Sequence, residues 1–411
     1  MRRLTKLPLR LGLLACATIA ATAAEREGEK AVYEQDAATP LFTTRFTTSF
    51  EHGAVPPPED RDPYPDYSAD DPLAPFDIER AASFIDNAAA KWGPKHGCVT
   101  CHTNGHYLIA PASIFSKRAA AAEVRDFAET WIASWDEIGL PDTEIVVAPA
   151  AFLAINNMQS EGELRPATRR ALAEAWALQS AEGHWPNWVK CNWPPFEQDD
   201  HYGVTLMTIA MGMAPEAYTS AEPARAGVER LLGWLAVNPP EEVHHRAMLL
   251  WASRWHDGLV TPELRRDWID ELLSLQKPSG GWASGDLGNW RQRAPESGGI
   301  GHLPQDVVDR DYPPVMVAEN GDGYGTGFVT YVLLQAGVPA TDDSLQRGLR
   351  WLKTNQQSDG KWFTNSLRNE PWTSNFLTHT GTVFALKALA EADASVAQVQ
   401  GPDSFGERSR R

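Results

Sequence analysis

The chain has 411 residues. With 43% hydrophobic residues and 16 tryptophans, it can bury a sizeable core in one large domain or two smaller ones. Its 54 acidic residues against 37 basic ones give a formal net charge of −17. This balance argues against nucleic acid or an anionic membrane as partner, and an acidic surface of this kind mostly serves solubility.

The first 23 residues have the pattern of an export signal. Basic residues precede an apolar run from 11 to 20, and small residues follow it at 21–23. The run is too short for a transmembrane anchor, and no later stretch is long and apolar enough, so we expect an exported protein, periplasmic or secreted. Leu13-Leu14-Ala15-Cys16 also resembles a lipoprotein box, which leaves lipidation of Cys16 open.

Two further segments are expected to lie outside the folded core. The stretch from 24 to 75 is rich in proline, which predicts a strap or linker rather than a long helix. Within it, aromatic and threonine residues alternate from Leu41 to Phe50 and predict one short strand. Residues 397–411 are polar and are expected to form a disordered tail.

The segment Cys98-Val99-Thr100-Cys101-His102 has the spacing that attaches c-type haem. Two thiols at this spacing can bond the two vinyl groups of one porphyrin, and the adjacent histidine can then ligate the iron. Such haem is attached outside the cytoplasm, in agreement with the export signal. The sequence therefore predicts haem c as cofactor, bound by Cys98, Cys101 and His102.

Other interpretations of this motif fit less well and stay open. A zinc knuckle needs more ligands at paired spacing, and Cys191 is the one further cysteine once Cys16 is set aside. A thioredoxin-like redox pair requires an alternating α/β pattern. A structural disulfide gives His102 no role.

An internal repeat predicts the fold. Three segments have the form Q-x-x-x-G-x-W, each between two apolar runs: Gln179–Trp185, Gln276–Trp282 and Gln356–Trp362. We expect each to join an outer helix, ended by the glycine in a left-handed cap, to an inner helix. The tryptophan then folds back over the turn, and the glutamine bonds free backbone groups. Inner helices are expected to start near 104, 145, 201, 243, 323 and 379.

These repeats resemble those of the squalene–hopene cyclase and protein prenyltransferase superfamily, and Arg347–Trp362 matches a full QW motif of the cyclases. The resemblance is firm from about 170 to 392 and weaker from 77 to 159. It implies an all-α fold, an α/α toroid of six helical hairpins around a central cavity, which we place at residues 76–396. The motif is specific for the fold and says little about chemistry.

The catalytic residues of that superfamily do not carry over. No Asp-x-Asp-Asp tetrad occurs, and the pair Asp199-Asp200 is expected to cap the inner helix at His201 rather than to act as an acid. The zinc-binding histidine of the prenyltransferases matches His379, but the required cysteine is missing near Asp322. The adjacent pair at 244 and 245 lacks metal-binding neighbours and is expected on the polar surface of the toroid mouth.

His379 is also the predicted second ligand of the haem iron. His106 lies four residues after His102, so on a continuing helix both side chains emerge from the same face. In a closed ring the sixth hairpin neighbours the first, and His379 then lies level with the haem. The alternative is an iron that is open or binds water.

Together these features predict an exported haem protein that transfers electrons, with a redox partner protein, or that oxidises an apolar molecule held in the cavity. The first alternative is a cyclase-like isomerase or isoprenoid-binding protein with structural haem. The second is a non-catalytic interaction scaffold. Whether the chain is an enzyme is left open.

Overall fold

The computed structural model describes residues 67–138, 143–186, 188, 194–196, 199–290, 317–367 and 375–399, and these are the residues considered below. They all belong to the compact unit Phe46–Arg411. The predicted signal peptide, Cys16, the strand at 41–50, Cys191, most of the strap and the tail beyond 399 lie outside them. Within the described residues the structure is helical, apart from turns and one isolated β-bridge.

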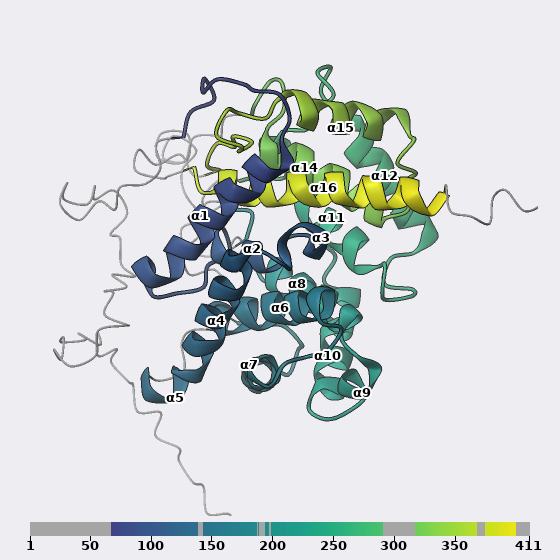
Figure 1. The fold of residues 1–411 in the computed structure, drawn as a ribbon. Helices are drawn as coiled ribbons and strands as arrows, with labels where there is room; N and C mark the ends of the chain where they lie inside the picture. The colour runs from purple at the N-terminus through teal and green to yellow at the C-terminus, as the bar shows by residue number, and fades with distance from the viewer. Residues whose placement is uncertain are drawn as a thin grey trace, which may run out of the picture. The chain divides into compact units, whose positions relative to one another are not determined.

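Six helices form the inner ring of an α/α toroid, which confirms the predicted fold class. Each inner helix contacts the next one along the chain, and the sixth contacts the first, so the ring is closed (Figure 1). The predicted starts agree with the observed ones to within a few residues. The inner helices are α2 (Asn104–Leu108), α6 (Thr143–Ser160), α8 (His201–Met213), α11 (Val243–Ala252), α14 (Gly323–Gln335) and α16 (Leu377–Val399).

Six outer helices pack on this ring, each preceding its inner helix in the chain. Their sequences are amphipathic: α15, for example, buries Leu345 and Leu352 and leaves Lys353 exposed. The outer helices are α1 (Ile78–His96), α4 (Ala119–Ala133), α7 (Pro166–Ala177), α10 (Ala224–Val237), α12 (Pro262–Ser274) and α15 (Asp343–Thr354). Shorter helices lie in the connections: α3 (Ala112–Phe115), α5 (Trp135–Ile138), α9 (Glu216–Thr219) and the 3-10 helix η2 (Ser284–Leu287).

The glutamine of each repeat turn donates hydrogen bonds to backbone carbonyls of its own turn and of the next hairpin. Gln356 Nε2 donates to the Gly360 carbonyl of its own turn at 3.0 Å and to the Asp77 carbonyl, just before α1, at 2.9 Å. The backbone bonding predicted for the glutamine is confirmed, and the second acceptor belongs to the neighbouring hairpin. The matching bonds run from Gln179 to Gly183 and Gly227, and from Gln276 to Gly280 and Ser344.

The tryptophan and the glycine of each turn have distinct roles. Trp362 is completely buried, and its indole N–H donates to the Leu352 carbonyl at 2.7 Å. Gly360 has a φ of 104° but lies beyond Thr354, where α15 ends, so the predicted helix cap is wrong. The glycine is required where the turn meets the next outer helix, because a Cβ at Gly360 would lie 2.4 Å from the Arg80 carbonyl oxygen of α1.

The described end of the strap lies along the last repeat turn. Ala74 N donates to the Gln356 carbonyl at 3.0 Å, and Ser358 N donates to the Pro72 carbonyl at 2.7 Å. The turn that begins at Gln356 therefore holds the strap as well as the first outer helix. Both contacts help to close the ring.

The last helix, α16, continues through Val399, beyond the predicted toroid boundary at 396. It packs so closely against α14 that a Cβ at Gly327 would lie 2.5 Å from Ala385 N.

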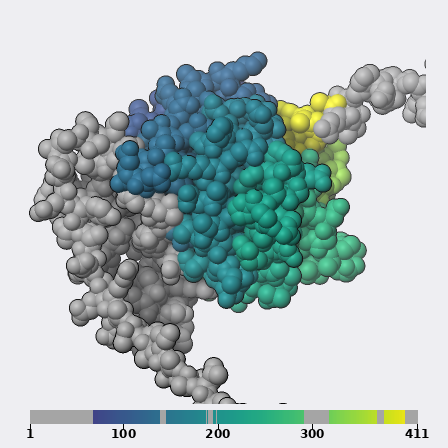
Figure 2. All heavy atoms as spheres, turned by 90° about the horizontal axis from the view of Figure 1, so that it is seen from below, coloured from purple at the N-terminus to yellow at the C-terminus, as the bar shows by residue number. Residues whose placement is uncertain are grey.

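Figure 2 shows a second view, in which the teal atoms of the middle helices form a continuous surface.

Candidate functional site

The Cys98–His102 segment links the first outer helix to the first inner helix. It takes the position that a repeat turn has in three later hairpins, as the sequence predicts. Gly97 ends α1 with a φ of 67°, and its N–H donates to the Gly93 carbonyl at 2.8 Å. Because α2 begins at Asn104, the segment is short and held at both ends.

Two residues of α2 determine the shape of this link. Asn104 Oδ1 accepts the Thr100 N–H at 2.9 Å, and Asn104 Nδ2 donates to the Cys98 carbonyl at 2.9 Å. A Cβ at Gly105 would lie 2.2 Å from the Thr100 carbonyl oxygen, so this position requires glycine. The amide of Asn104 thus fixes the backbone that carries the two cysteines.

Both cysteines are buried thiols, 5% and 8% exposed, and they form no disulfide. Burial raises the pKa of the Cys98 thiol to about 12, and the nearby Trp92 only partly opposes this. Cys98 therefore remains protonated at neutral pH, which makes it a poor nucleophile toward soluble reagents.

Aromatic rings surround the imidazole of His102. The Phe376 ring stacks on it at a centroid distance of 4.5 Å and an angle of 10°, and Trp92 meets its edge at 4.9 Å. Burial, followed by the nearby His379, lowers the pKa of His102 well below its usual value. The ring is therefore neutral and keeps the nitrogen lone pair that a metal ligand requires.

His379 is brought next to the haem motif by the closure of the ring. The Thr103 hydroxyl lies 2.9 Å from His102 Nδ1 and 2.9 Å from His379 Nδ1. Thr380 Oγ1, the next hydroxyl of α16, donates to the His102 carbonyl at 2.9 Å. The predicted neighbourhood of the first and sixth hairpins is confirmed, whereas ligation of iron by His379 stays a prediction.

The strap contributes a further contact to this site. The Tyr67 hydroxyl lies 3.0 Å from His379 Nε2, and its ring meets the edge of the imidazole at 5.6 Å. Burial raises the pKa of Tyr67 above its ordinary value, so its hydroxyl is protonated. The sequence gives no signal for the partnership of Tyr67 with His379.

The chemistry of these residues fits a covalently bound haem. Two reduced thiols at the required spacing precede a neutral histidine, and the surrounding rings suit a flat, apolar group. Among the described residues no group of three or more histidine, cysteine or acidic side chains could hold a bare metal ion.

The centre of the ring is filled by the chain's own side chains in the described structure. Phe384 of α16 meets Trp251 of α11 across the ring at 6.1 Å, and Tyr202 of α8 bonds His106 Nε2 of α2 at 3.3 Å. These four residues are 2% exposed or less. Side chains of different inner helices thus contact one another in the part of the ring where the family resemblance predicts a central cavity and an apolar molecule.

The histidine pair at 244 and 245 does not lie on the mouth surface, because both residues are completely buried. His244 Nε2 bonds the Tyr324 hydroxyl at 2.7 Å, and His244 Nδ1 lies 3.4 Å from His245 Nδ1. His245 Nε2 in turn lies 3.1 Å from Asp199 Oδ1. A line of polar contacts thus runs from the core to a half-buried carboxylate.

Asp199, rather than the N-cap residue Asp200, supplies the side-chain hydrogen bond at the start of the inner helix α8. Asp199 Oδ1 accepts the His201 N–H at 2.9 Å, whereas Asp200 makes no capping bond with its side chain. Burial alone would lower the pKa of His201, but hydrogen bonds to Asp199 and to the Asn238 carbonyl raise it overall. Burial would raise the pKa of Asp199, but His245 and His201 lower it. His201 Nδ1 lies 3.5 Å from Asp199 Oδ1, so the two side chains form an ion pair when the His201 ring is protonated.

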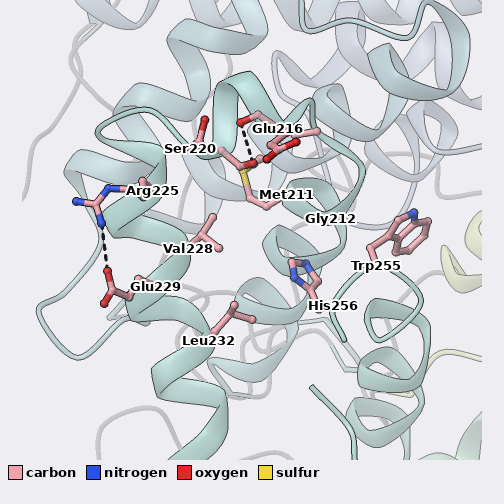
Figure 3. A pocket seen from close by; sticks show the side chains of 12 residues that line it. Met211, Gly212, Glu216, Ser220, Arg225, Val228, Glu229, Leu232, Trp255 and His256 are labelled. Atoms are coloured by element: carbon pink, nitrogen blue, oxygen red, sulfur yellow. Dashed lines mark hydrogen bonds and ion pairs between the residues drawn. The ribbon is translucent and has the colours of Figure 1, made fainter. Parts of the chain in front are cut away.

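A surface pocket of about 630 Å³ lies away from these residues, at the other end of α8 (Figure 3). Met211, Trp255 and His256 lie on one side of it, and His256 Nε2 bonds the Thr208 carbonyl at 2.9 Å. Arg225 on the facing helix pairs with Glu229.

Comparison with known proteins adds the following. No family model matches the chain, and no curated protein matches it. Among solved structures, a glycosidase variant matches with 12% identity and a TM-score of 0.47, over 77% of this chain and 99% of that one. A possible GH105 member from Salmonella enterica matches with 11% identity and a TM-score of 0.47, over 82% and 97%. The ent-copalyl diphosphate synthase from Streptomyces platensis has 14% identity and a TM-score of 0.41, over 75% and 54%.

These matches correct the function predicted from the sequence. Glycosidases stand among the matching structures and do not agree with the predicted electron transfer or haem-dependent redox chemistry, which is not carried further. At these identities and scores, none of the matches assigns an activity to this chain. No helix of the described residues is long and apolar enough to cross a membrane.

Proposed function

We propose that this chain is an exported haem-binding protein with one haem attached covalently at the first helical hairpin. Cys98 and Cys101 are the attachment residues, and His102 is the iron ligand. The observation that supports the proposal is the pair of buried, reduced thiols held directly before His102 at the mouth of the ring. Export is part of the proposal, because such attachment takes place outside the cytoplasm.

The structure supports this assignment through the backbone of the link. Asn104 bonds the Cys98 carbonyl and the Thr100 N–H, so the two cysteines are held in one short, fixed segment. The neutral ring of His102 is packed by Phe376 and Trp92, which limits its motion. A ligand held by packing in this way needs little reorganisation to bind.

The attachment reaction requires no oxidant and no leaving group. Each thiol forms a bond from its sulfur to one carbon of a vinyl group and gives its hydrogen to the other carbon. Two thioether bonds form in this way, and the overall oxidation state does not change. When bound, the haem supplies an iron atom, which His102 ligates through Nε2.

The test is production of the full chain with its own signal in a host that matures c-type haem. Because thioether bonds survive denaturation, we expect a haem-stained band on a denaturing gel and a polypeptide mass increased by one haem. Cys98→Ala combined with Cys101→Ala is expected to lose both signals. A colourless wild-type protein of unmodified mass from such a host contradicts the proposal.

Two further variants make the result specific. Cys191→Ala changes the cysteine outside the motif and is expected to keep the full stain. Cys98→Ala alone leaves one thioether and is expected to weaken the stain without abolishing it. Loss of haem in Cys191→Ala would place the attachment elsewhere and overturn the assignment.

A further inference from the structure

We infer that Thr103 and Tyr67 are positioning residues whose hydrogen bonds fix the tautomers of His102 and His379. His102 is then the sole protein ligand of the iron, and His379 stays beside it as a hydrogen-bonded neighbour. This inference rests on the haem attachment proposed above. It concerns which histidine nitrogen carries a hydrogen, and this follows from three hydrogen bonds.

The Thr103 hydroxyl connects the two histidines. It lies 2.9 Å from His102 Nδ1 and 2.9 Å from His379 Nδ1. Thr103 is completely buried, and His379 is 3% exposed, so water does not replace these bonds. Within the described residues, these two contacts are the ones in which the hydroxyl takes part.

A hydroxyl has one hydrogen to donate. If both rings donated to Thr103, its own hydrogen would lack an acceptor at a buried site, which is unfavourable. Each bond therefore has a direction: one histidine donates its Nδ1–H to Thr103, and Thr103 donates to Nδ1 of the other. A neutral imidazole carries a single N–H, so the two rings are opposite tautomers.

Only one of the two rings can then ligate iron through Nε2. Ligation through this atom requires the hydrogen on Nδ1, and the proposed attachment assigns that tautomer to His102. His379 consequently accepts at Nδ1 and carries its hydrogen on Nε2. That hydrogen has an acceptor, the Tyr67 oxygen at 3.0 Å. Both nitrogens of His379 thus take part in hydrogen bonds. This favours an iron whose second ligand position is open or binds water over ligation by His379.

Tyr67 is itself held in place from several directions. The Phe84 ring lies 5.5 Å from the Tyr67 ring, and Lys361 Nζ lies 5.0 Å above it. Lys361 is fixed in turn by an ion pair with Asp71 of the strap at 2.8 Å. Asn375 Nδ2 donates to the Tyr67 carbonyl at 3.2 Å. The strap therefore aims the Tyr67 oxygen at His379.

Nitrogen-15 NMR of the chain without haem tests the tautomers directly. We expect His102 to carry its hydrogen on Nδ1 and His379 on Nε2. Thr103→Val removes the hydroxyl and keeps the shape of the side chain. In this variant we expect the tautomer of one ring no longer to determine the tautomer of the other. The same tautomer in both rings of the wild type, or the reverse assignment, would overturn the inference.

Electron paramagnetic resonance of the haem-loaded ferric protein gives the second readout. We expect a high-spin signal in the wild type and in His379→Ala. The double variant Thr103→Val with Tyr67→Phe frees His379, so we expect a low-spin bis-histidine signal that returns to high-spin when His379→Ala is added. A low-spin wild type, or a double variant that stays high-spin, contradicts the inference.

A matched control separates this role from packing. Thr208→Val removes an equally buried hydroxyl from α8 and is expected to leave the spin state unchanged. Failure of the two proposals is distinguishable, because a wild type without covalent haem refutes the attachment, while the tautomers are measured without haem. If haem is attached but its spin state is the same in the wild type and in the Thr103→Val, Tyr67→Phe double variant, only the positioning role is refuted.

Discussion

At the scale of single residues, Lys387 is an unusual member of the core. This lysine of α16 is 3% exposed, and its Nζ donates to the Ile109 carbonyl at 2.9 Å. The ammonium lies 4.5 Å from the centroid of the Tyr331 ring and 5.3 Å from that of Trp251. Burial lowers the pKa of Lys387 to about 7, although Glu391 partly opposes this.

We expect Lys387 to make stability rise with pH. Between pH 7 and about 10.5 the unfolded chain binds a proton at this lysine that the folded protein does not bind, so raising the pH favours folding. The slope is at most about 1.4 kcal/mol per pH unit. Lys387→Met should remove this rise in urea unfolding between pH 7 and 9.5, whereas Lys353→Met, on the exposed face of α15, should keep it. Equal slopes in wild type and Lys387→Met would contradict the assignment.

The ion pair between Asp199 and His201 predicts the opposite trend at higher pH. The pKa of His201 is raised, so its contribution to stability is full below about pH 6.5 and is lost as the pH rises through the raised value. The pKa of Asp199 is lowered, so its contribution is present above about pH 4 and is lost on acidification. The pair thus stabilises most between about pH 4 and 6.5.

We expect Asp199→Asn to destabilise the fold by about 1–3 kcal/mol at pH 5.5, because His201 and the buried His245 lose the carboxylate that lies 3.5 Å and 3.1 Å from their ring nitrogens. The difference from wild type should shrink at pH 8.5, as measured by chemical denaturation. Asp200→Asn is the matched control, since Asp200 makes no capping bond. A loss in Asp199→Asn that is equal at both pH values would exclude the ion pair.

At the scale of elements, the repeat turn is the unit that the sequence predicts best. Its glutamine, glycine and tryptophan recur at fixed spacing, and each makes the same contact in all three copies. The indole N–H bonds a carbonyl ten residues earlier at 2.7 Å in every case, for Trp185, Trp282 and Trp362. The sequence repeat reveals such elements because the same residue types make the same contacts in each copy.

Trp362→Ala is expected to destabilise the protein by about 3–5 kcal/mol, because the ring is completely buried and the change leaves a large cavity. Urea unfolding followed by circular dichroism measures this. Trp234→Phe, in the half-buried part of α10, serves as a control for the removal of an indole outside the turns. A neutral effect of Trp362→Ala would show that the turn is not part of the folded core.

Elements without a repeat were predicted less well. The pair Asp199-Asp200 was expected to cap α8, but spacing cannot separate two adjacent carboxylates. In the structure Asp199 accepts the His201 N–H, and Asp200 makes no capping bond with its side chain. His244 and His245 were expected at the surface because no neighbour in the sequence could pair with them. Their partners, Tyr324 and Asp199, lie on other hairpins, and only the closed ring brings them together. The haem segment itself is a local motif, but Thr103, Tyr67 and His379 meet only through the fold.

At the scale of the whole molecule, closure of the ring depends on the contact between the last turn and α1. Gly360→Ala tests this contact, because its Cβ would press against the Arg80 carbonyl at 2.4 Å. Gly337→Ala is the matched control, with a φ of 87° and no atom within 4 Å of the added Cβ. Both substitutions place alanine at a positive φ and cause the same backbone strain, but only Gly360→Ala adds the close approach to Arg80. We therefore expect Gly360→Ala to lower the midpoint of thermal unfolding further than Gly337→Ala. Equal shifts would show that closure does not depend on this close approach.

The closed ring also implies an order of events after export. Phe376, His379 and Thr380, which pack on the Cys98–His102 segment, come from the last hairpin of the chain. That segment is therefore uncovered until the final helix docks on the first hairpin. If haem is attached as proposed, delay in that docking would lengthen the period in which haem can be added, and the rate of ring closure would set a time limit on cofactor loading.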